Sequence, residues 1–430
     1  MKRCKHVKII QINGLFNRFD YVISLSGDGL TILTGPNGYG KSTILKIINY
    51  LSIGEIGIFK LMEVSFKSLK ISFKNGHEIF IENNSKTFSI DSVKIDKSKV
   101  RNLLRKLFTS RYGYYIDEEF IVDRRRGIKY TMSEYFEKIL SNNDVESSLF
   151  YEESYFLKEF FNKESLSAVD KIKKSIGKVY MVQEQRLIKQ INDREKNISI
   201  NVIEEIPGKI KQKINAASSN YSAVASKLDG SYPNRLFSNM EELSEEDFKT
   251  KLEIMNFKWK KLASYNLSTI EPLQNNIYNR EYAKALKIYF DDFDKKYLEY
   301  ESLINEFDMF TEIVNRRLTH KKIRIEREKG IIVVDDNDEL LNMGELSSGE
   351  KQIIVLFYEL LFETEKCSLL LIDEPEISLH IVWQKMFMDD LLKITKLKNL
   401  NVIVATHSAQ IINNHWDRQV DLEELYGKFN

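Results

Sequence analysis

The run Gly35-Pro36-Asn37-Gly38-Tyr39-Gly40-Lys41-Ser42 fits the pattern GxxxxGK[ST]. It follows an apolar segment, 30–33, and opens a segment with helical spacing, 41–51. In that context the backbone N–H groups of a glycine-rich turn surround a phosphate, and the positive end of the helix dipole adds to the attraction. We expect Lys41 to reach the β- and γ-phosphate oxygens and Ser42 to bind Mg²⁺. The predicted nucleotide-binding residues of this run are Gly35, Pro36, Asn37, Gly38, Gly40, Lys41, Ser42 and Thr43.

Two acids follow a second apolar run, 369–372. At the tip of a strand, Asp373 is placed to hold Mg²⁺ through water, and Glu374 is placed to polarise the attacking water. A third apolar run, 402–405, leads to His407, which is placed to sense the γ-phosphate. Each feature alone has an ordinary structural explanation, because such residues are common at strand ends. Together they predict catalytic roles for Lys41, Glu374 and His407, and metal binding by Ser42 and Asp373.

Another feature suited to bind an anion is Ser347-Ser348-Gly349, which precedes a helix that begins near Glu350. Small residues at a helix N-terminus leave backbone N–H groups open to an anion. The alternative is an ordinary N-cap, in which a serine hydroxyl accepts a hydrogen bond from the helix itself.

The elements that must position these residues fall into five expected segments, which are 1–85, 86–178, 179–194, 195–321 and 322–430. The first is mostly strand-like and carries the glycine-rich run, and the last begins with a hairpin and then alternates helix and apolar strand. The second and fourth segments have helical patterns. The third begins with a strand that returns to the first sheet. The alternation of helix and apolar strand in the last segment, 322–430, predicts an α/β fold with a parallel sheet.

Within the fourth segment, apolar residues recur at alternating steps of four and three, which is a heptad seam. Two interpretations stay open. The seam forms a short antiparallel coiled-coil arm or a contact with another subunit, or it is the core-facing stripe of one helix in a helical lobe. The stripe consists of Leu286, Phe290, Phe293, Tyr297, Tyr300, Ile304, Phe307, Thr311, Val314 and Leu318.

Composition excludes several classes of protein. The 64 basic and 63 acidic residues leave a net charge of +1, so bulk charge does not drive nucleic-acid binding. A hydrophobic fraction of 43% excludes global disorder. The two cysteines form no CxxC pair, so no zinc site is indicated. We expect no signal peptide, no contact with a membrane and a cytoplasmic location, because the longest apolar stretch, 353–362, is too short to span a bilayer.

In this order along the chain, the motifs resemble those of an ABC-type ATPase head of the SMC, RecF and OLD class. Gly35–Ser42 resembles the Walker A motif, Leu346–Glu350 the signature motif, Ile372-Asp373-Glu374 the Walker B motif, and His407 the switch histidine. The resemblance implies a P-loop ATPase head that binds ATP and Mg²⁺. Its mixed sheet has antiparallel N-terminal strands, and a large helical insertion splits the head.

The resemblance also implies contacts between subunits. In that family the signature motif of one subunit completes the nucleotide site of its partner, which predicts a head-to-head dimer or higher homo-oligomer. The signature residues expected at the nucleotide are Ser347, Ser348 and Gly349, with Ser348 where the family usually has glycine. Gln183 follows the strand-like run 179–182 and is predicted to contact nucleotide and metal, in preference to Gln185; a surface glutamine in a loop is the alternative.

Spacing and the last residues narrow the expected class. Leu346 follows Lys41 by 305 positions, which exceeds the helical subdomain of a transporter ATPase, and because 23 residues follow His407 we expect no nuclease domain after it. The run 405–417 resembles the stand-alone ATPases of bacterial anti-phage systems, first the AriA subunit of PARIS and next the Septu ATPase. That resemblance implies a separate nuclease effector as partner, with a phage protein as a candidate trigger.

Two other functions stay open. Basic clusters at Arg124–Arg126 and Arg316–Lys329 are compatible with a RecF-like DNA-repair ATPase that binds DNA, although solvated surfaces explain them equally well. A scaffold in which ATP only joins subunits is the third hypothesis, and Glu374 and His407 argue against it.

Overall fold

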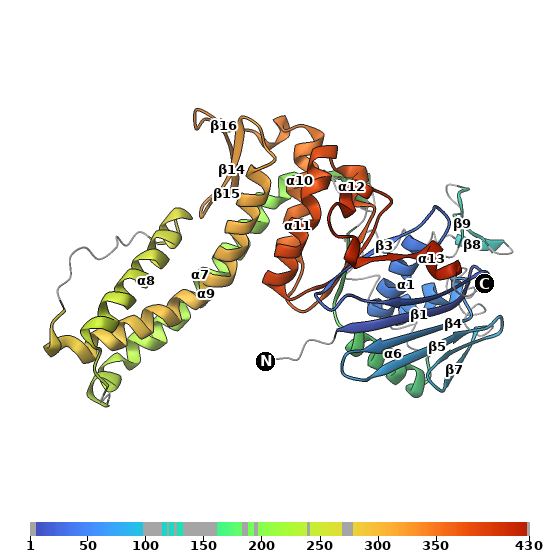
Figure 1. The fold of residues 1–430 in the computed structure, drawn as a ribbon, viewed down its shortest axis with the longest axis horizontal. Helices are drawn as coiled ribbons and strands as arrows, with labels where there is room; N and C mark the ends of the chain where they lie inside the picture. Colours follow the sequence, from blue (N-terminus) through green and yellow to red (C-terminus); the bar gives the residue numbers. More distant parts are fainter. Residues whose placement is uncertain are drawn as a thin grey trace. The chain divides into compact units, whose positions relative to one another are not determined.

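The computed structural model describes residues 6–97, 114–117, 120–123, 127–131, 161–182, 188–192, 197–238, 241–268 and 278–427 (Figure 1). Contacts divide the chain into two compact units. Unit 1 comprises Met1–Ile200 and Glu363–Asn430, and unit 2 comprises Asn201–Phe362. Within the described parts of the chain, no helix is both long enough and apolar enough to cross a lipid bilayer.

A five-stranded parallel sheet carries the predicted site of unit 1. Its strand order is β11-β17-β18-β3-β19. The strands β3 and β18 are mostly apolar and buried along their whole length, which is the pattern of parallel strands covered on both faces. The strands are β3 (Leu30–Thr34), β11 (Val179–Val182), β17 (Leu369–Asp373), β18 (Asn401–Ala405) and β19 (Gln419–Asp421).

A six-stranded antiparallel sheet forms the second layer of unit 1, in the order β2-β1-β4-β5-β6-β7. Burial alternates along β4 and β5, so one face of this sheet packs on the core and the other faces solvent. The core lies between the two sheets and includes helix α1. The strands are β1 (Val7–Leu15), β2 (Phe19–Ser24), β4 (Ser68–Phe73), β5 (Glu78–Asn83), β6 (Thr87–Ile90) and β7 (Val93–Asp96).

The helices of unit 1 cover these sheets or connect their strands. Helix α1 contacts three strands of the parallel sheet and lies beside α2 and α6. The helices are α1 (Lys41–Ile53), α2 (Glu55–Glu63), α6 (Lys163–Ile176), η5 (Pro375–Ser378), α11 (Ile381–Lys398), α12 (Ala409–Ile412), η6 (Trp416–Arg418) and α13 (Leu422–Gly427). Two small sheets comprise β8 (Tyr114–Asp117), β9 (Phe120–Asp123) and β10 (Lys129–Thr131), and β12 (Ile188–Asn192) and β13 (Asn197–Asn201).

Long helices dominate unit 2. Helices α7 and α9 lie alongside each other, and α8 packs on α9 (Figure 1). A three-stranded antiparallel sheet and α10 complete the unit. The elements are α7 (Val202–Ser238), α8 (Glu245–Ser264), η2 (Arg280–Tyr282), α9 (Ala283–Asn315), β14 (Lys321–Glu326), β15 (Gly330–Asp335), β16 (Leu340–Leu341), η3 (Met343–Glu345) and α10 (Ser348–Tyr358), which a π-helical turn (Glu359–Glu363) follows.

The heptad stripe packs within the chain. Tyr300 stacks near Tyr221 of α7 with ring centroids 5.3 Å apart and donates a hydrogen bond to Ser218 at 2.9 Å. On the α8 side, Phe293 packs against Trp259 with centroids 5.3 Å apart. The stripe therefore covers α7 and α8 of the same unit, and the helix ends three residues before the last predicted stripe position, Leu318.

The α/β class, the antiparallel N-terminal strands and the large helical part are confirmed, although parallel and antiparallel strands fall into separate sheets. The expected helical segment 86–178 differs from the structure, since its described residues include β6 to β10 besides α6. Strand β6 places Phe88 and Ile90 in the core, and Asp91 turns the chain into β7 with a φ of 51°. This tight hairpin is local turn chemistry that a helical periodicity count does not capture.

Candidate nucleotide site

The glycine-rich run forms the turn between β3 and α1. Gly38 and Gly40 have φ angles of 86° and 89°, in the region that favours glycine. A Cβ on Gly40 would lie 2.7 Å from Leu15, so this position also lacks space for a side chain. Gly40 occupies the N-cap position of α1 without a side-chain cap, which leaves the helix N-terminus to its backbone groups. The turn is therefore suited to surround a phosphate.

Lys41, the first residue of α1, points back across the turn. Its ammonium donates to the carbonyl oxygens of Gly35 at 2.9 Å and Pro36 at 3.3 Å, and its side chain also contacts the imidazole of His407. Only 5% of Lys41 is exposed. Burial lowers the pKa of Lys41, and the negative charges of Glu374 and Asp373 oppose that effect. The Lys41 ammonium therefore lies where the charged oxygens of a bound phosphate would replace the carbonyl oxygens of Gly35 and Pro36 as its hydrogen-bond partners.

Two oxygen ligands suited to Mg²⁺ lie side by side next to the turn. The Ser42 hydroxyl donates to a carboxylate oxygen of Asp373 at 2.9 Å. Asp373 ends β17, and Ser42 is the second residue of α1. Burial raises the pKa of Asp373, and this effect outweighs the opposing hydrogen bond from Ser42 and the charges of Lys46 and Lys41. A hydroxyl and a desolvated carboxylate are oxygen donors of the kind that Mg²⁺ prefers, so these residues fit the ion.

Glu374 and His407 face each other at the same edge of the parallel sheet. A carboxylate oxygen of Glu374 lies 3.6 Å from Nε2 of His407. Glu374 has φ 43° and ψ 59°, a left-handed conformation that is costly for a residue with a Cβ. Its N–H donates to the carbonyl of Ala405 at 2.9 Å, which holds this turn against the end of β18. The structure therefore brings together the three predicted catalytic side chains, Lys41, Glu374 and His407.

The other predicted residues lie in the glycine-rich run and helix α1, outside the described part of the chain, or at the N-terminus of α10. Pro36 and Asn37 are exposed in the turn, and Thr43 is half-buried in α1. Gln183 lies outside the described residues, as do Gln185 and the basic cluster Arg124–Arg126.

Ser347, Ser348 and Gly349 lie at the N-terminus of α10 in unit 2. The hydroxyl of Ser347 accepts a hydrogen bond from the N–H of Glu350 at 3.3 Å, and the Glu350 carboxylate accepts one from the N–H of Ser347 at 2.7 Å. This is a capping box, so the N-cap alternative is present. Both serines are nevertheless exposed.

Sequence reasoning gave no role to two residues that bind the segment of His407. Glu376 accepts hydrogen bonds from three groups of residues 406–408, and Gln384 contacts the same segment from α11. In the sequence, the run 376–380 begins two residues after Glu374. The carboxylate at its first position was the available signal.

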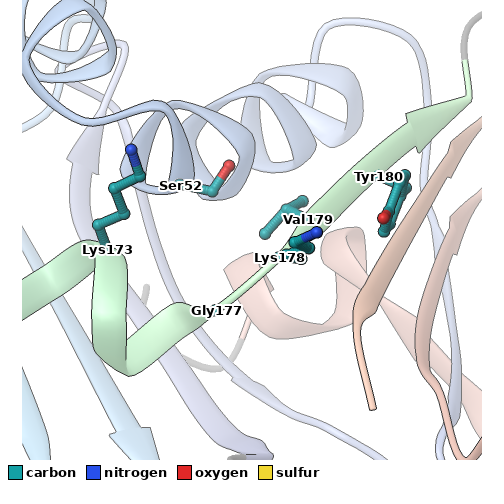
Figure 2. A pocket seen from close by; sticks show the side chains of 6 residues that line it. All are labelled: Ser52, Lys173, Gly177, Lys178, Val179 and Tyr180. Atoms are coloured by element: carbon teal, nitrogen blue, oxygen red, sulfur yellow. The ribbon is translucent and has the colours of Figure 1, made fainter. Parts of the chain in front are cut away.

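A cavity of about 390 Å³ lies elsewhere in unit 1 (Figure 2). It is found where α6 ends and β11 begins, so it opens near the amino-terminal edge of the parallel sheet rather than the carboxyl edge that holds Lys41. Lys178 beside it pairs with Glu365. The cavity is therefore separate from the nucleotide site. Its lining residues are Ser52, Lys173, Gly177, Lys178, Val179 and Tyr180.

Known proteins were compared with this chain in three ways. The chain is similar to the SMC head domain of Pyrococcus furiosus bound to the C-terminal domain of ScpA, with 14% identity, a TM-score of 0.37 and coverage of 95% of this chain and 91% of that one. The SMC head domain from Thermotoga maritima matches with 14% identity, a TM-score of 0.35 and the same coverages. A search of curated proteins found no match. The sequence profile of the AAA ATPase domain family matches residues 10–412, so the chain belongs to this family and is an ATP-hydrolysing enzyme.

Proposed function

We propose that this enzyme binds Mg²⁺ and ATP at the turn after β3 and uses ATP to join two copies of itself head to head. The observation that carries the proposal is the convergence of Lys41, Glu374 and His407 beside the Ser42–Asp373 pair. These are the parts that phosphoryl transfer to water requires, namely a cation at the phosphates, ligands for a metal and a base for the water. Family membership favours hydrolysis over a scaffold that only binds ATP.

Each side chain has a proposed role. Lys41 neutralises the β- and γ-phosphate oxygens, and Ser42 and Asp373 hold Mg²⁺, which supplies positive charge to the phosphates when bound. Glu374 orients and polarises the attacking water, while His407 contacts the γ-phosphate. Gln183 stays a predicted nucleotide and metal contact.

The second copy is proposed to contribute the N-terminus of α10. Ser347 and Ser348 are exposed there, and a helix N-terminus attracts anions. In the proposed dimer this end of α10 contacts the γ-phosphate of ATP bound to the partner. The functional head would then combine the segments 1–85, 179–194 and 322–430, with 86–178 and 195–321 as insertions.

The size of the particle with and without nucleotide tests the dimer. With Glu374→Gln, which keeps the size of the side chain but removes the base, we expect ATP and Mg²⁺ to double the mass measured by light scattering after size exclusion. Adding Ser348→Arg should keep the ATP-loaded protein at the smaller mass while a fluorescent ATP analogue still binds. Glu339→Gln, which makes the same exchange at an exposed acid, is the matched control for Glu374→Gln. An unchanged mass for Glu374→Gln with ATP contradicts the proposal.

The biological role is proposed as control of a separate nuclease effector in anti-phage defence, with a phage protein as trigger. Its support is the resemblance of the run 405–417 to stand-alone defence ATPases. Co-expression with the product of the adjacent reading frame tests it. We expect that protein to co-purify and to cleave nucleic acid in a manner that differs between the wild-type chain and Glu374→Gln. Absence of a co-purifying nuclease would remove this role and leave the ATPase untouched.

The alternative, a RecF-like DNA-binding ATPase, relies on basic clusters. In the described cluster, Arg317 is buried against the ring of Phe357, Lys321 pairs with Glu350 at 3.1 Å, and Arg324 pairs with Asp338. Acids of unit 2 therefore compensate the charges of Lys321 and Arg324, and the burial of Arg317 keeps it from the surface, which weakens this alternative. DNA binding that strengthens with ATP and falls steeply with added salt would restore it.

A further inference from the structure

One carboxylate joins the turn after β17 to the segment that carries His407. Glu376 lies in η5, and its Oε1 accepts hydrogen bonds from the Thr406 hydroxyl at 2.7 Å and from the N–H groups of His407 at 2.8 Å and Ser408 at 3.1 Å. Two consecutive N–H groups that converge on a carboxylate form charge-assisted bonds. Because these bonds fix the peptide planes on both sides of the histidine, they set the direction of its side chain.

A second side chain ties the same two segments together. The amide nitrogen of Gln384, on α11, donates to the carbonyl oxygens of Glu376 at 3.2 Å and Leu379 at 3.0 Å. Its amide oxygen accepts a hydrogen bond from the Ser408 hydroxyl at 2.8 Å. Helix α11 therefore holds the turn and the histidine segment in one arrangement.

The histidine segment is also bound to the strand of the phosphate turn. The N–H of Thr406, which is fully buried, donates to the carbonyl of Leu33 in β3 at 3.1 Å. The imidazole of His407 contacts Lys41 and lies close to Glu374. A short series of hydrogen bonds therefore connects the turn after β17 to His407 and the groups beside it, so a displacement of the turn would move them.

Glu376 carries a cost that a purely structural residue would avoid. Its second oxygen, Oε2, is buried and has no hydrogen-bond partner in the part of the chain that the structure describes. Burying a carboxylate oxygen without a partner is unfavourable, and an apolar side chain at this position would not have this cost. The three hydrogen bonds that Oε1 accepts offset this cost.

We infer that Glu376 is a positioning residue for ATP hydrolysis, which acts on the reaction through the backbone of His407 and Ser408. The inference rests on the proposed contact of His407 with the γ-phosphate. Glu374 is the N-cap residue of η5, which contains Glu376, so the same short turn carries both side chains. Glu376 itself touches none of the reacting groups.

Steady-state phosphate release by purified full-length protein tests the inference. We expect Glu376→Ala to lower kcat by about 10–100-fold, because small misplacements of a catalytic group have effects of this size, with KM for ATP changed less than about twofold. Glu376→Gln, whose amide oxygen still accepts hydrogen bonds, should recover most of the activity. Glu365→Ala, at an exposed acid of the same unit, is the matched control. Thermal midpoints of all variants show that each one is folded.

A double-mutant cycle separates positioning from a general structural role. In a His407→Ala background, adding Glu376→Ala should lower kcat by less than about twofold, because the group to be positioned is gone. An equal loss in both backgrounds overturns the inference, as does wild-type kcat for Glu376→Ala. If His407→Ala keeps wild-type kcat, the proposed role of the histidine falls together with the inference. If His407→Ala is slow while Glu376→Ala is not, the inference alone falls.

Discussion

The helical bundle of unit 2 and the candidate nucleotide site of unit 1 use charged side chains in opposite ways. In the bundle of unit 2, acids and bases meet in close pairs, such as Lys251 with Asp291 at 2.6 Å and a bidentate contact of Arg235 with both carboxylate oxygens of Asp292 at 2.6 Å. In unit 1, the buried Lys41 contacts carbonyl oxygens and an imidazole, and the half-buried Asp373 accepts a hydrogen bond from the Ser42 hydroxyl. Charges that are compensated stabilise a fold, whereas charges left short of partners can bind a ligand.

Exchanging Lys41 for alanine should have the largest effect. Because the lysine is the cationic side chain proposed to contact the phosphates of the ATP bound to its own subunit, we expect Lys41→Ala to lower the rate of phosphate release by about 100–1,000-fold and to weaken ATP binding. The measurement is phosphate release combined with binding of a fluorescent ATP analogue. Lys251→Ala in unit 2 is the matched control and should change the rate by less than about twofold. Equal losses in both variants would remove the contrast between the units.

Breaking the bidentate pair of unit 2 should affect stability rather than catalysis. Asp292 is 6% exposed, so Asp292→Ala leaves the Arg235 guanidinium partly buried without its carboxylate. We expect a loss of about 1–3 kcal/mol in the free energy of unfolding measured with urea. Asp292→Asn, which keeps one acceptor oxygen, should lose less. An unchanged urea midpoint for Asp292→Ala would show that this pair does not stabilise the bundle.

The pH dependence of stability should have opposite signs in the two units. Burial raises the pKa of Asp373, so between its ordinary and raised values the folded protein binds more protons than the unfolded chain, and stability falls as the pH rises through that window. At pH 7 the folded protein therefore carries the full cost in stability of an ionised Asp373. We therefore expect Asp373→Asn to raise the thermal midpoint of the nucleotide-free protein by about 2–4 °C at pH 7, with the difference shrinking as the pH falls into that window.

Asp291 of unit 2 is the control with the opposite sign. Burial alone would raise its pKa, but hydrogen bonds and charge from Lys251 and Lys287 hold it below its ordinary value. Its contribution to stability is present above the unfolded pKa and is lost as the pH falls through the folded pKa. Asp291→Asn should therefore lower the midpoint at pH 7. Thermal scans from pH 4 to pH 7 compare the two variants, and shifts of the same sign would contradict the contrast.

The parts of the site that follow contiguous motifs could be predicted from the sequence. The glycine-rich turn and the acids after β17 are short runs whose chemistry depends on a strand, a turn or a helix directly beside them. Glu376 could not be assigned in this way, because its partners, Thr406 to Ser408, lie some thirty residues away in sequence and bind it mainly through backbone N–H groups. Backbone donors leave no residue-type signal.

The fold was predictable to a similar depth. Apolar runs such as 30–33 and 402–405 identified the buried parallel strands, because strands covered on both faces have nearly continuous apolar sequences. The strands of β6 and β7 escaped detection, since each has four residues and too few alternations to show a period of two. Strand β19 has three residues and carries even less information.

The pairing of β3 has a consequence for how the protein is made on the ribosome. Both neighbours of β3 in the sheet, β18 and β19, come from the far end of the chain, and 387 residues separate Thr34 from its partner Asp421. At typical translation speeds the backbone N–H and C=O groups at both edges of β3 stay unpaired for roughly 20–80 s until these strands emerge. An unpaired apolar strand is prone to associate with other chains during such a delay. Yield of folded enzyme should therefore depend on chaperones that shield nascent chains, even though the finished site is rigidly hydrogen-bonded.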